Sequence, residues 1–114
     1  MARSPLPERD LNRIESWCES RVPAKLADEV RVEHHARGKC VTICETRAPR
    51  DGLGEWTHQA LAQLRYRADD AEWTLHWADR SSRWHEYREG GRFTGTAAEL
   101  LDEIDADPTS IFWG

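Results

Sequence analysis

Three consecutive segments of this 114-residue chain alternate apolar and polar side chains, at residues 60–67, 72–78 and 83–88. Alternation with a period of two is typical of a β-strand that has one buried face. The linking sequences 68–71 and 79–82 are short and contain Asp or Ser, and such turns connect antiparallel neighbours. The three segments therefore predict an antiparallel sheet with one apolar and one polar face.

Residues 30–44 show the same alternation on both sides of Gly38. They predict a β-hairpin that turns at Arg37-Gly38, followed by a loop at residues 48–55. With this hairpin the chain is expected to form a five-stranded antiparallel meander over residues 30–88. The turn places four side chains together on the apolar face, namely Val30, Val32, Val41 and Ile43, and places Glu33, His35, Cys40, Thr42 and Cys44 on the opposite face.

Apolar residues recur every three or four positions over residues 7–21 and again over residues 96–107. That period is typical of an α-helix with one apolar stripe. Pro7 suits the first turn of the first helix, and Thr96 with Glu99 forms a capping-box sequence at the start of the second. Both helices need an apolar surface to pack on, so we expect them together on the apolar face of the sheet.

The order of helix, five antiparallel strands and helix predicts an α+β fold. At this length, residues 1–114 are expected to form a single domain, with Gly90-Gly91 ending the sheet and an apolar tail at residues 108–114. No stretch approaches the ~20 apolar residues of a membrane helix, and the N-terminal sequence lacks a hydrophobic signal segment. We therefore expect a cytoplasmic protein without membrane contact, whose three cysteines are reduced.

Loop lengths decide which side chains share a face, because opposite residues of paired strands point the same way. Four-residue loops at 68–71 and 79–82 place His76 opposite His85. The expected apolar face then consists of Ala62, Leu64, Tyr66, Trp73, Leu75, Trp77 and Trp84. The expected polar face consists of Gln63, Arg65, Thr74, His76, Arg83, His85 and Tyr87.

The chain contains six tryptophans, several times what an average composition predicts. Such an excess is compatible with a base-stacking platform for nucleic acid. The expected faces argue against that interpretation, because the three tryptophans of the last two strands fall on the apolar face and Trp17 belongs to the first helix. Only Trp56 and Trp113 remain available for recognition. The excess therefore predicts a core filled with large aromatic rings.

The richest candidate site is a cluster of basic and hydroxyl side chains on the expected polar face. Arginine forks hold phosphate or carboxylate oxygens, and histidine transfers protons near neutral pH. The cluster predicts anion recognition or acid–base chemistry on a phosphodiester. The alternative is an ordinary solvated sheet face. The candidate ligand-binding residues are Arg65, His76, Arg83, His85 and Tyr87.

Neither a metal site nor a cofactor site is predicted. Cys40 and Cys44 are four residues apart on one strand, roughly 13 Å along it, which is too far to share an ion. The predicted cross-strand pairs, His35 with Cys40 and His76 with His85, supply two ligands each, and no third ligand is evident. The glycines match neither a phosphate-binding loop nor a dinucleotide-binding pattern.

The tail ends in three large apolar residues, Ile111, Phe112 and Trp113. Side chains of this kind are not expected to extend into water. Either they dock into the core of their own domain, or Phe112 and Trp113 anchor the chain to a protein partner or to a second copy.

The last twelve residues, EIDADPTSIFWG, resemble the C-terminus of small bacterial proteins grouped as the domain of unknown function 3024 family. The resemblance covers about residues 10–114 and implies a stand-alone domain, without implying a reaction, a substrate or a cofactor. Ser110 stands where the family pattern leads us to expect glycine. Other sequences similar to the family's hallmarks are Val30–His34, Val41–Glu45, Glu55–Thr57, Trp73–Trp77 and Arg83–Tyr87.

No complete catalytic constellation is present, so we expect a binding or regulatory module that binds a protein or an anion through its polar sheet face or its tail. The alternative is a small metal-independent ribonuclease-like enzyme that uses Arg65, His76, His85 and Tyr87. A net charge of −5 argues against non-specific nucleic-acid binding, so nucleic acid enters only under that alternative. A third interpretation is a structural subunit that completes its core by forming a dimer.

Overall fold

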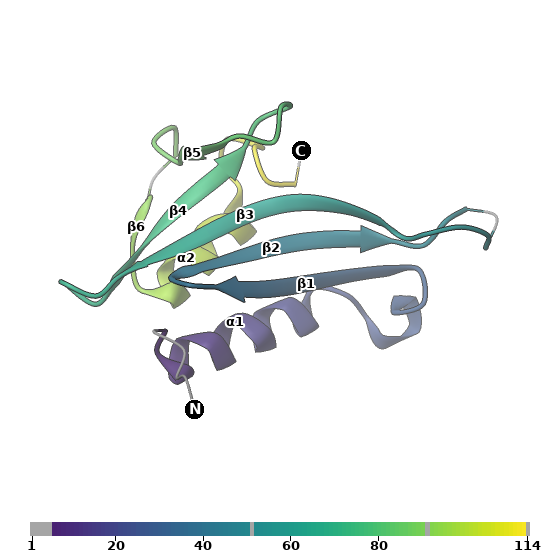
Figure 1. The fold of residues 1–114 in the computed structure, drawn as a ribbon, viewed down its shortest axis with the longest axis horizontal. Helices are drawn as coiled ribbons and strands as arrows, with labels where there is room; N and C mark the ends of the chain where they lie inside the picture. Colours follow the sequence, from purple (N-terminus) through teal and green to yellow (C-terminus); the bar gives the residue numbers. More distant parts are fainter. Residues whose placement is uncertain (1–5, 51, 91, 114) are drawn as a thin grey trace.

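The computed structural model describes all residues except 1–5, 51, 91 and 114 (Figure 1). Asp51 of the predicted loop, Gly91 of the predicted sheet end and Gly114 of the predicted tail therefore lie outside the described residues. The elements are, in chain order, α1 (Glu8–Ser20), a 3-10 helix η1 (Ala24–Leu26), β1 (Val30–Arg37), β2 (Cys40–Arg47), β3 (Thr57–Arg67), β4 (Glu72–Ala78), β5 (Trp84–Glu86), β6 (Thr94–Gly95) and α2 (Ala97–Ala106).

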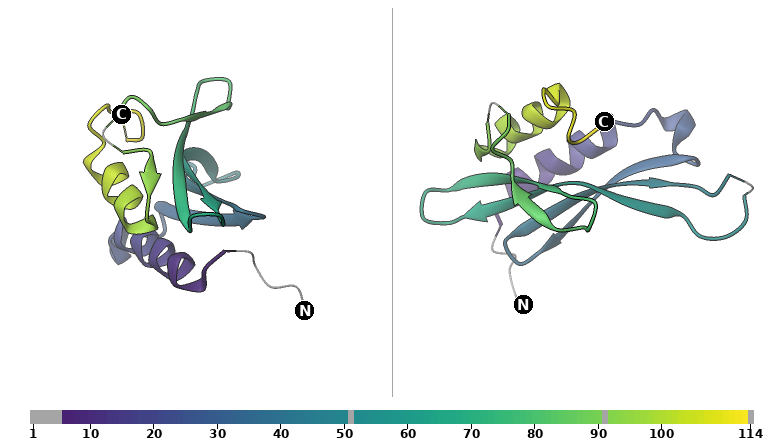
Figure 2. Two further views of the ribbon diagram at one scale, coloured as in Figure 1. Left: turned by 90° about the vertical axis from the view of Figure 1, so that its left-hand side faces the viewer. Right: turned by 90° about the horizontal axis from the view of Figure 1, so that it is seen from above.

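The strands form one antiparallel sheet in the order β1-β2-β3-β4-β5, and the short strand β6 also pairs with β4. Figure 2 shows both α-helices on the same face of the sheet. The predicted α+β fold of helix, five-stranded meander and helix is confirmed. The sequence pattern did not predict η1 and β6, which are only three and two residues long.

The capping box at the start of α2 is present as predicted. The hydroxyl of Thr96 accepts a hydrogen bond from the backbone N–H of Glu99, and the Glu99 carboxylate accepts one from the backbone N–H of Thr96. At the other end of α2, Asp107 adopts a left-handed conformation with φ 41°. That conformation ends the helix before Pro108, as the sequence indicated.

The first hairpin turns one residue later than predicted. Arg37 pairs with Cys40 across Gly38-Lys39, and Gly38 takes the positive φ of 60° that the tight turn requires. Moving a two-residue turn by one position shifts every strand pair by two residues. His35 therefore lies opposite Thr42 instead of Cys40, while the side chains keep their predicted faces.

The pairing of β3 with β4 matches the prediction, with Leu64 opposite Leu75 and Tyr66 opposite Trp73. The β2–β3 ladder contains an irregularity that the sequence did not reveal. Ile43 pairs with Ala62 and Cys44 with Ala60, so that the intervening residue of β3 forms a β-bulge.

The predicted register of β4 with β5 is wrong by one residue. Asp79 and Arg83 close a three-residue loop instead of a four-residue loop, and Ser82 in this loop adopts φ 63°. The Asp79 carboxylate accepts hydrogen bonds from the backbone N–H groups of Ser81 and Arg83, which stabilises the tight loop. An odd change of loop length moves every β5 side chain to the opposite face. Trp84 and Tyr87 thus exchange the positions predicted for them.

The core lies between the sheet and the two helices. It contains Ile14 and Cys18 from α1, Leu100 and Ile104 from α2, and the sheet residues Val41, Ile43, Leu64, Trp73 and Leu75. Tyr87 joins this core with its side chain fully buried, and its hydroxyl donates a hydrogen bond of 2.9 Å to the Glu103 carboxylate. A side chain on Gly90 would overlap the Tyr87 ring, so the absence of a Cβ there lets the loop after β5 close over it.

The C-terminal tail folds back onto its own domain. The Asp107 carboxylate accepts hydrogen bonds from the backbone N–H groups of both Phe112 and Trp113. The Phe112 ring is buried against Tyr87, at 5.0 Å between ring centroids, and the Trp113 indole donates to the backbone carbonyl of Ile104. Phe112 therefore docks into the core of its own domain, whereas Trp113 remains 39% exposed.

Candidate functional site

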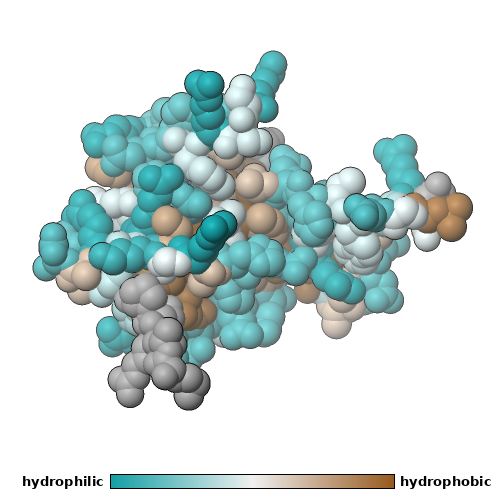
Figure 3. All heavy atoms as spheres, viewed as in Figure 1, coloured by the Kyte–Doolittle hydropathy of each residue, from teal (hydrophilic) through white to brown (hydrophobic). Residues whose placement is uncertain are grey.

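The polar face of the sheet, on the side away from the helices, carries two rows of side chains that cross the strands. One row runs through His35, Thr42, Gln63, His76 and Glu86, each directly opposite the next. The second row runs through Cys40, Arg65 and Thr74. We call the face formed by these two rows and Trp84 the open face. Figure 3 shows that the viewed surface is mostly hydrophilic, with small apolar areas between the polar groups.

Arg65 is the most unusual cation on the open face. Its Nε donates a 2.7 Å hydrogen bond to the side-chain oxygen of Gln63, and the Gln63 amide donates a 3.0 Å bond to the Thr42 hydroxyl. Of the arginines that the structure describes, only Arg65 is half-buried, and the others are exposed. No carboxylate of a described residue forms an ion pair with it. The two terminal nitrogens of a positioned guanidinium are therefore available to a ligand.

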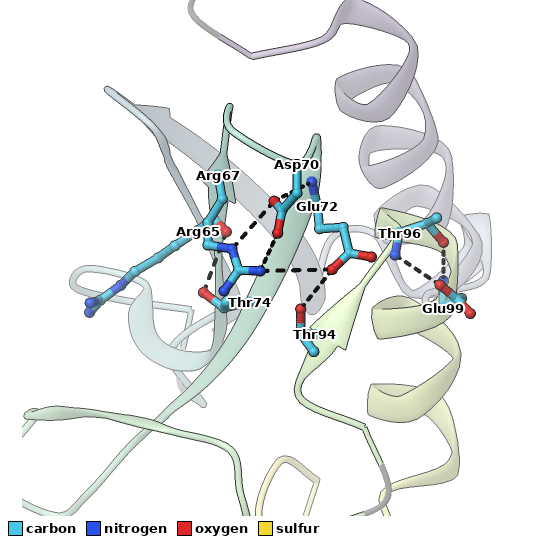
Figure 4. Close-up of polar contacts among 8 residues, drawn as sticks. All are labelled: Arg65, Arg67, Asp70, Glu72, Thr74, Thr94, Thr96 and Glu99. Carbon is cyan, nitrogen blue, oxygen red and sulfur yellow. Dashed lines mark hydrogen bonds and ion pairs between the residues drawn. The ribbon is translucent and has the colours of Figure 1, made fainter.

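Figure 4 shows how Arg65 differs from its neighbour on the same strand, Arg67. The Arg67 guanidinium lies against Asp70, which lowers the pKa of that carboxyl, and it also faces Glu72. The side chain of Arg65 extends away from this acidic group in the opposite direction. Arg65 and Arg67 are two residues apart on β3 and share a face, so the two arginines differ in their carboxylate partners and not in their side of the sheet.

Thr74 and His76 form the buried floor of the open face. The Thr74 hydroxyl and the His76 Nε2 are hydrogen-bonded at 2.8 Å, and only 7% and 5% of the two residues are exposed. Burial, followed by the positive charge of Arg65, lowers the pKa of His76 to about 4, and Glu86 opposes this shift. At neutral pH the His76 imidazole is therefore uncharged, and it can both donate and accept a hydrogen bond.

A groove with a volume of about 810 Å³ lies over this floor. Trp84 contributes a half-buried indole to it from the edge strand β5. Trp77 also lines the groove, and its Nε1 is buried without an acceptor among the described residues. The full lining consists of Arg65, Arg67, Thr74, His76, Trp77, Trp84, His85, Glu86, Arg88 and Glu89.

The structure brings together only part of the predicted cluster. Arg65 and His76 lie on the polar face as expected, in adjacent rows. Tyr87 was expected on that face and is instead fully buried in the core, because the three-residue loop reverses β5. Arg83 lies in the exposed loop before β5, and it is not one of the described residues that line the groove.

His85 was predicted opposite His76 on the polar face, and this placement is also wrong. It pairs with Trp77 instead, with 4.8 Å between the ring centroids, and its Nε2 lies 2.7 Å from the Asp79 carboxylate. His85 reaches the groove only at its rim, as an exposed side chain. His76 and His85 therefore do not form a cross-strand pair. Acid–base catalysis that uses both histidines would require such a pair.

Trp84 was expected on the apolar face and Glu86 was not among the predicted site residues, yet both line the groove. The hydrophobic pattern could not have found them, because over residues 83–88 either register places one large aromatic residue, Trp84 or Tyr87, and two polar residues on each face. A glycine or asparagine at position 82 would have indicated a left-handed residue and hence a three-residue loop. The serine at that position carries no such signal.

The two predicted partner-binding residues, Phe112 and Trp113, differ in exposure. Phe112 is 4% exposed, whereas Trp113 is 39% exposed and lies 6.3 Å from Trp17 between ring centroids.

Among the described residues, no group of three histidine, cysteine or acidic side chains is arranged to hold a metal ion. No helix in the described part of the chain is long and apolar enough to cross a membrane.

Comparison with known proteins identifies a family and no individual relative. No curated protein and no solved structure matches the chain. The family model that matches is described as a domain of unknown function, and the match extends over residues 2–114. Since this range includes nearly the whole sequence, the chain belongs to the domain of unknown function family DUF3024.

Proposed function

We propose that the protein is a small binding module that takes an anionic group, a carboxylate or a phosphate, at Arg65 on the open face. The observation that carries this proposal is a half-buried guanidinium without a carboxylate partner among the described residues. Partly burying an unpaired charge is unfavourable, and an anion bound in the groove would offset that cost.

The surroundings of Arg65 support an anion at this position. Gln63 orients the guanidinium through Nε, which leaves the two terminal nitrogens in the forked arrangement that recognises two oxygens of one anion. The neutral imidazole of His76 and the hydroxyl of Thr74 lie in the same groove as hydrogen-bonding groups. The groove therefore offers both charge and neutral polar contacts to one ligand.

The ribonuclease-like alternative has less support. A general base at neutral pH works best with a pKa near 7, and the pKa of His76 is about 4. His85 is bonded to Asp79 at the rim, and Tyr87 is buried with its hydroxyl donating to Glu103. These residues do not converge on one position where a substrate phosphate would react.

The test is isothermal titration with inorganic phosphate and with acetate at low ionic strength. We expect Arg65→Gln to weaken binding of either ion at least about tenfold, because it removes the charge and keeps a polar side chain. Arg83→Gln is the matched control, since Arg83 is an exposed arginine outside the groove. Circular dichroism checks that both variants are folded. Equal weakening by the two substitutions, or no binding by the unmodified protein, would refute the proposal.

A further inference from the structure

The indole of Trp84 lies on the open face, in the same groove as Arg65. The ladder places Trp84 opposite Ala78, on the face that also carries His76 and Glu86. A tryptophan in this position is half-buried and belongs to neither the helix-covered core nor the core cluster of buried residues. It contributes a large flat surface where the fold itself needs no aromatic ring.

We propose that the groove binds a small ligand that combines a flat aromatic ring, stacked on Trp84, with an anionic group held by Arg65, as in a nucleoside monophosphate. This inference rests on the proposed function, since it takes the Arg65 anion site as one end of the ligand. Stacking on an aromatic side chain and a charged contact to a guanidinium are the two contacts that recognise base and phosphate.

The separation of the two residues sets the size of the ligand. Arg65 lies beside Thr74 and Trp84 beside Ala78, four residues further along β4. At about 3.3 Å per residue this is roughly 13 Å along the strand, and the long arginine side chain shortens the gap. A lone inorganic anion occupies one end of such a groove, whereas a ring joined to a phosphate through a sugar reaches both ends.

The residues between these ends favour a ligand with hydrogen-bond donors. His76 is neutral at pH 7, and Glu86 lies directly opposite it across the strand pair. A carboxylate in this position accepts hydrogen bonds from amino or hydroxyl groups and repels further phosphates. Together with the net charge of −5, it disfavours a polyanionic nucleic-acid chain and favours a single nucleotide.

Isothermal titration with three ligands tests the inference: adenosine 5′-monophosphate, ribose 5-phosphate and inorganic phosphate. We expect the nucleotide to bind about tenfold more tightly than ribose 5-phosphate, which lacks the ring. Trp84→Leu should remove this difference and leave ribose 5-phosphate binding unchanged. Arg65→Gln should weaken all three ligands. Trp56→Leu is the matched control, because Trp56 is also half-buried and stacks on Arg31 away from the groove.

The outcomes separate the inference from the proposed function. If the nucleotide and ribose 5-phosphate bind equally in an Arg65-dependent manner, the ring contact is refuted and the anion site remains. If none of the three ligands binds, both proposals are refuted. If a single-stranded oligonucleotide binds more tightly per molecule than the mononucleotide, with dependence on Trp84, the restriction to a small ligand is overturned.

Discussion

The two faces of the sheet differ in whether their polar side chains have partners within the domain. On the helix-covered face, three polar aromatic side chains donate to acidic partners within the domain. The indole of Trp17 donates to Asp105, the indole of Trp73 to Asp10 and the hydroxyl of Tyr87 to Glu103. On the open face, the terminal nitrogens of Arg65 are not bonded to any described carboxylate.

We infer that the covered face contributes to stability and that the open face is suited to recognition. These three bonds stabilise the fold, because an unsatisfied buried donor costs roughly 1–3 kcal/mol, although the buried Nε1 of Trp77 lacks an acceptor among the described residues. The open face keeps one guanidinium positioned by Gln63 and unneutralised, which adds nothing evident to the fold. A binding role explains that arrangement. Substitutions of Trp84 and Tyr87, which lie on opposite faces, test the difference between the two faces most directly.

Tyr87 and Trp84 are three residues apart in sequence and belong to opposite faces. We expect Tyr87→Ala to lower the free energy of unfolding by about 3–5 kcal/mol, because a fully buried ring in contact with Phe112 is lost. Trp84→Ala should cost roughly 1 kcal/mol or less, since its ring lies on the solvent side of the sheet. Urea denaturation measures both values. A larger loss for Trp84 would place Trp84 in the core and refute the observed register.

The buried histidine of the open face predicts how stability changes with pH. His76 has a pKa of about 4 in the folded protein and about 6.5 when unfolded, so the unfolded chain binds more protons between these values. The free energy of unfolding therefore has its full value above pH 6.5. It decreases as the pH falls toward 4, by as much as about 3 kcal/mol. Urea denaturation from pH 7.5 to 4 measures this loss in the unmodified protein and in His76→Gln. The variant should have the flatter profile, and parallel profiles would contradict the burial of His76.

The smallest expected effect concerns the tail. Ser110 adopts φ 59°, a left-handed conformation that favours glycine, and it occupies the position where the family pattern leads us to expect glycine. Ser110→Gly should raise the free energy of unfolding by about 0.5 kcal/mol, because relief of strain exceeds the added flexibility of the unfolded chain. Thermal unfolding measures the change, with Ser81→Gly as the control at a loop residue without a positive φ. A loss of stability in Ser110→Gly would show that the serine is not strained.

Two hairpins show how far the sequence predicts the open face. In the first hairpin the turn lies one residue from its predicted position, and the faces are still correct because the pairs shift by two. In the β4–β5 hairpin the loop is one residue shorter than predicted, and the faces are reversed. Arg65 and His76 lie on the predicted face because both are on strands before that loop. The predictions for His85 and Tyr87 failed because both lie after it.

The sequence by itself determined the α+β order of elements, the two amphipathic helices and the capping box, since these depend on periodicity and on residues close together in the chain. Only the tertiary structure decided whether Trp84 or Tyr87 entered the core. Each face of residues 83–88 carries one large aromatic residue and two polar residues, so burial of either face gains a similar hydrophobic free energy. The choice follows from the hydrogen bonds that Asp79 makes within its loop and from the site for the Tyr87 ring between Gly90, Glu103 and Phe112. The Asp79 bonds are local, whereas the contacts of Tyr87 with Glu103 and Phe112 join residues distant in sequence. With Tyr87 in the core, Trp84 lies on the open face, in the same groove as Arg65.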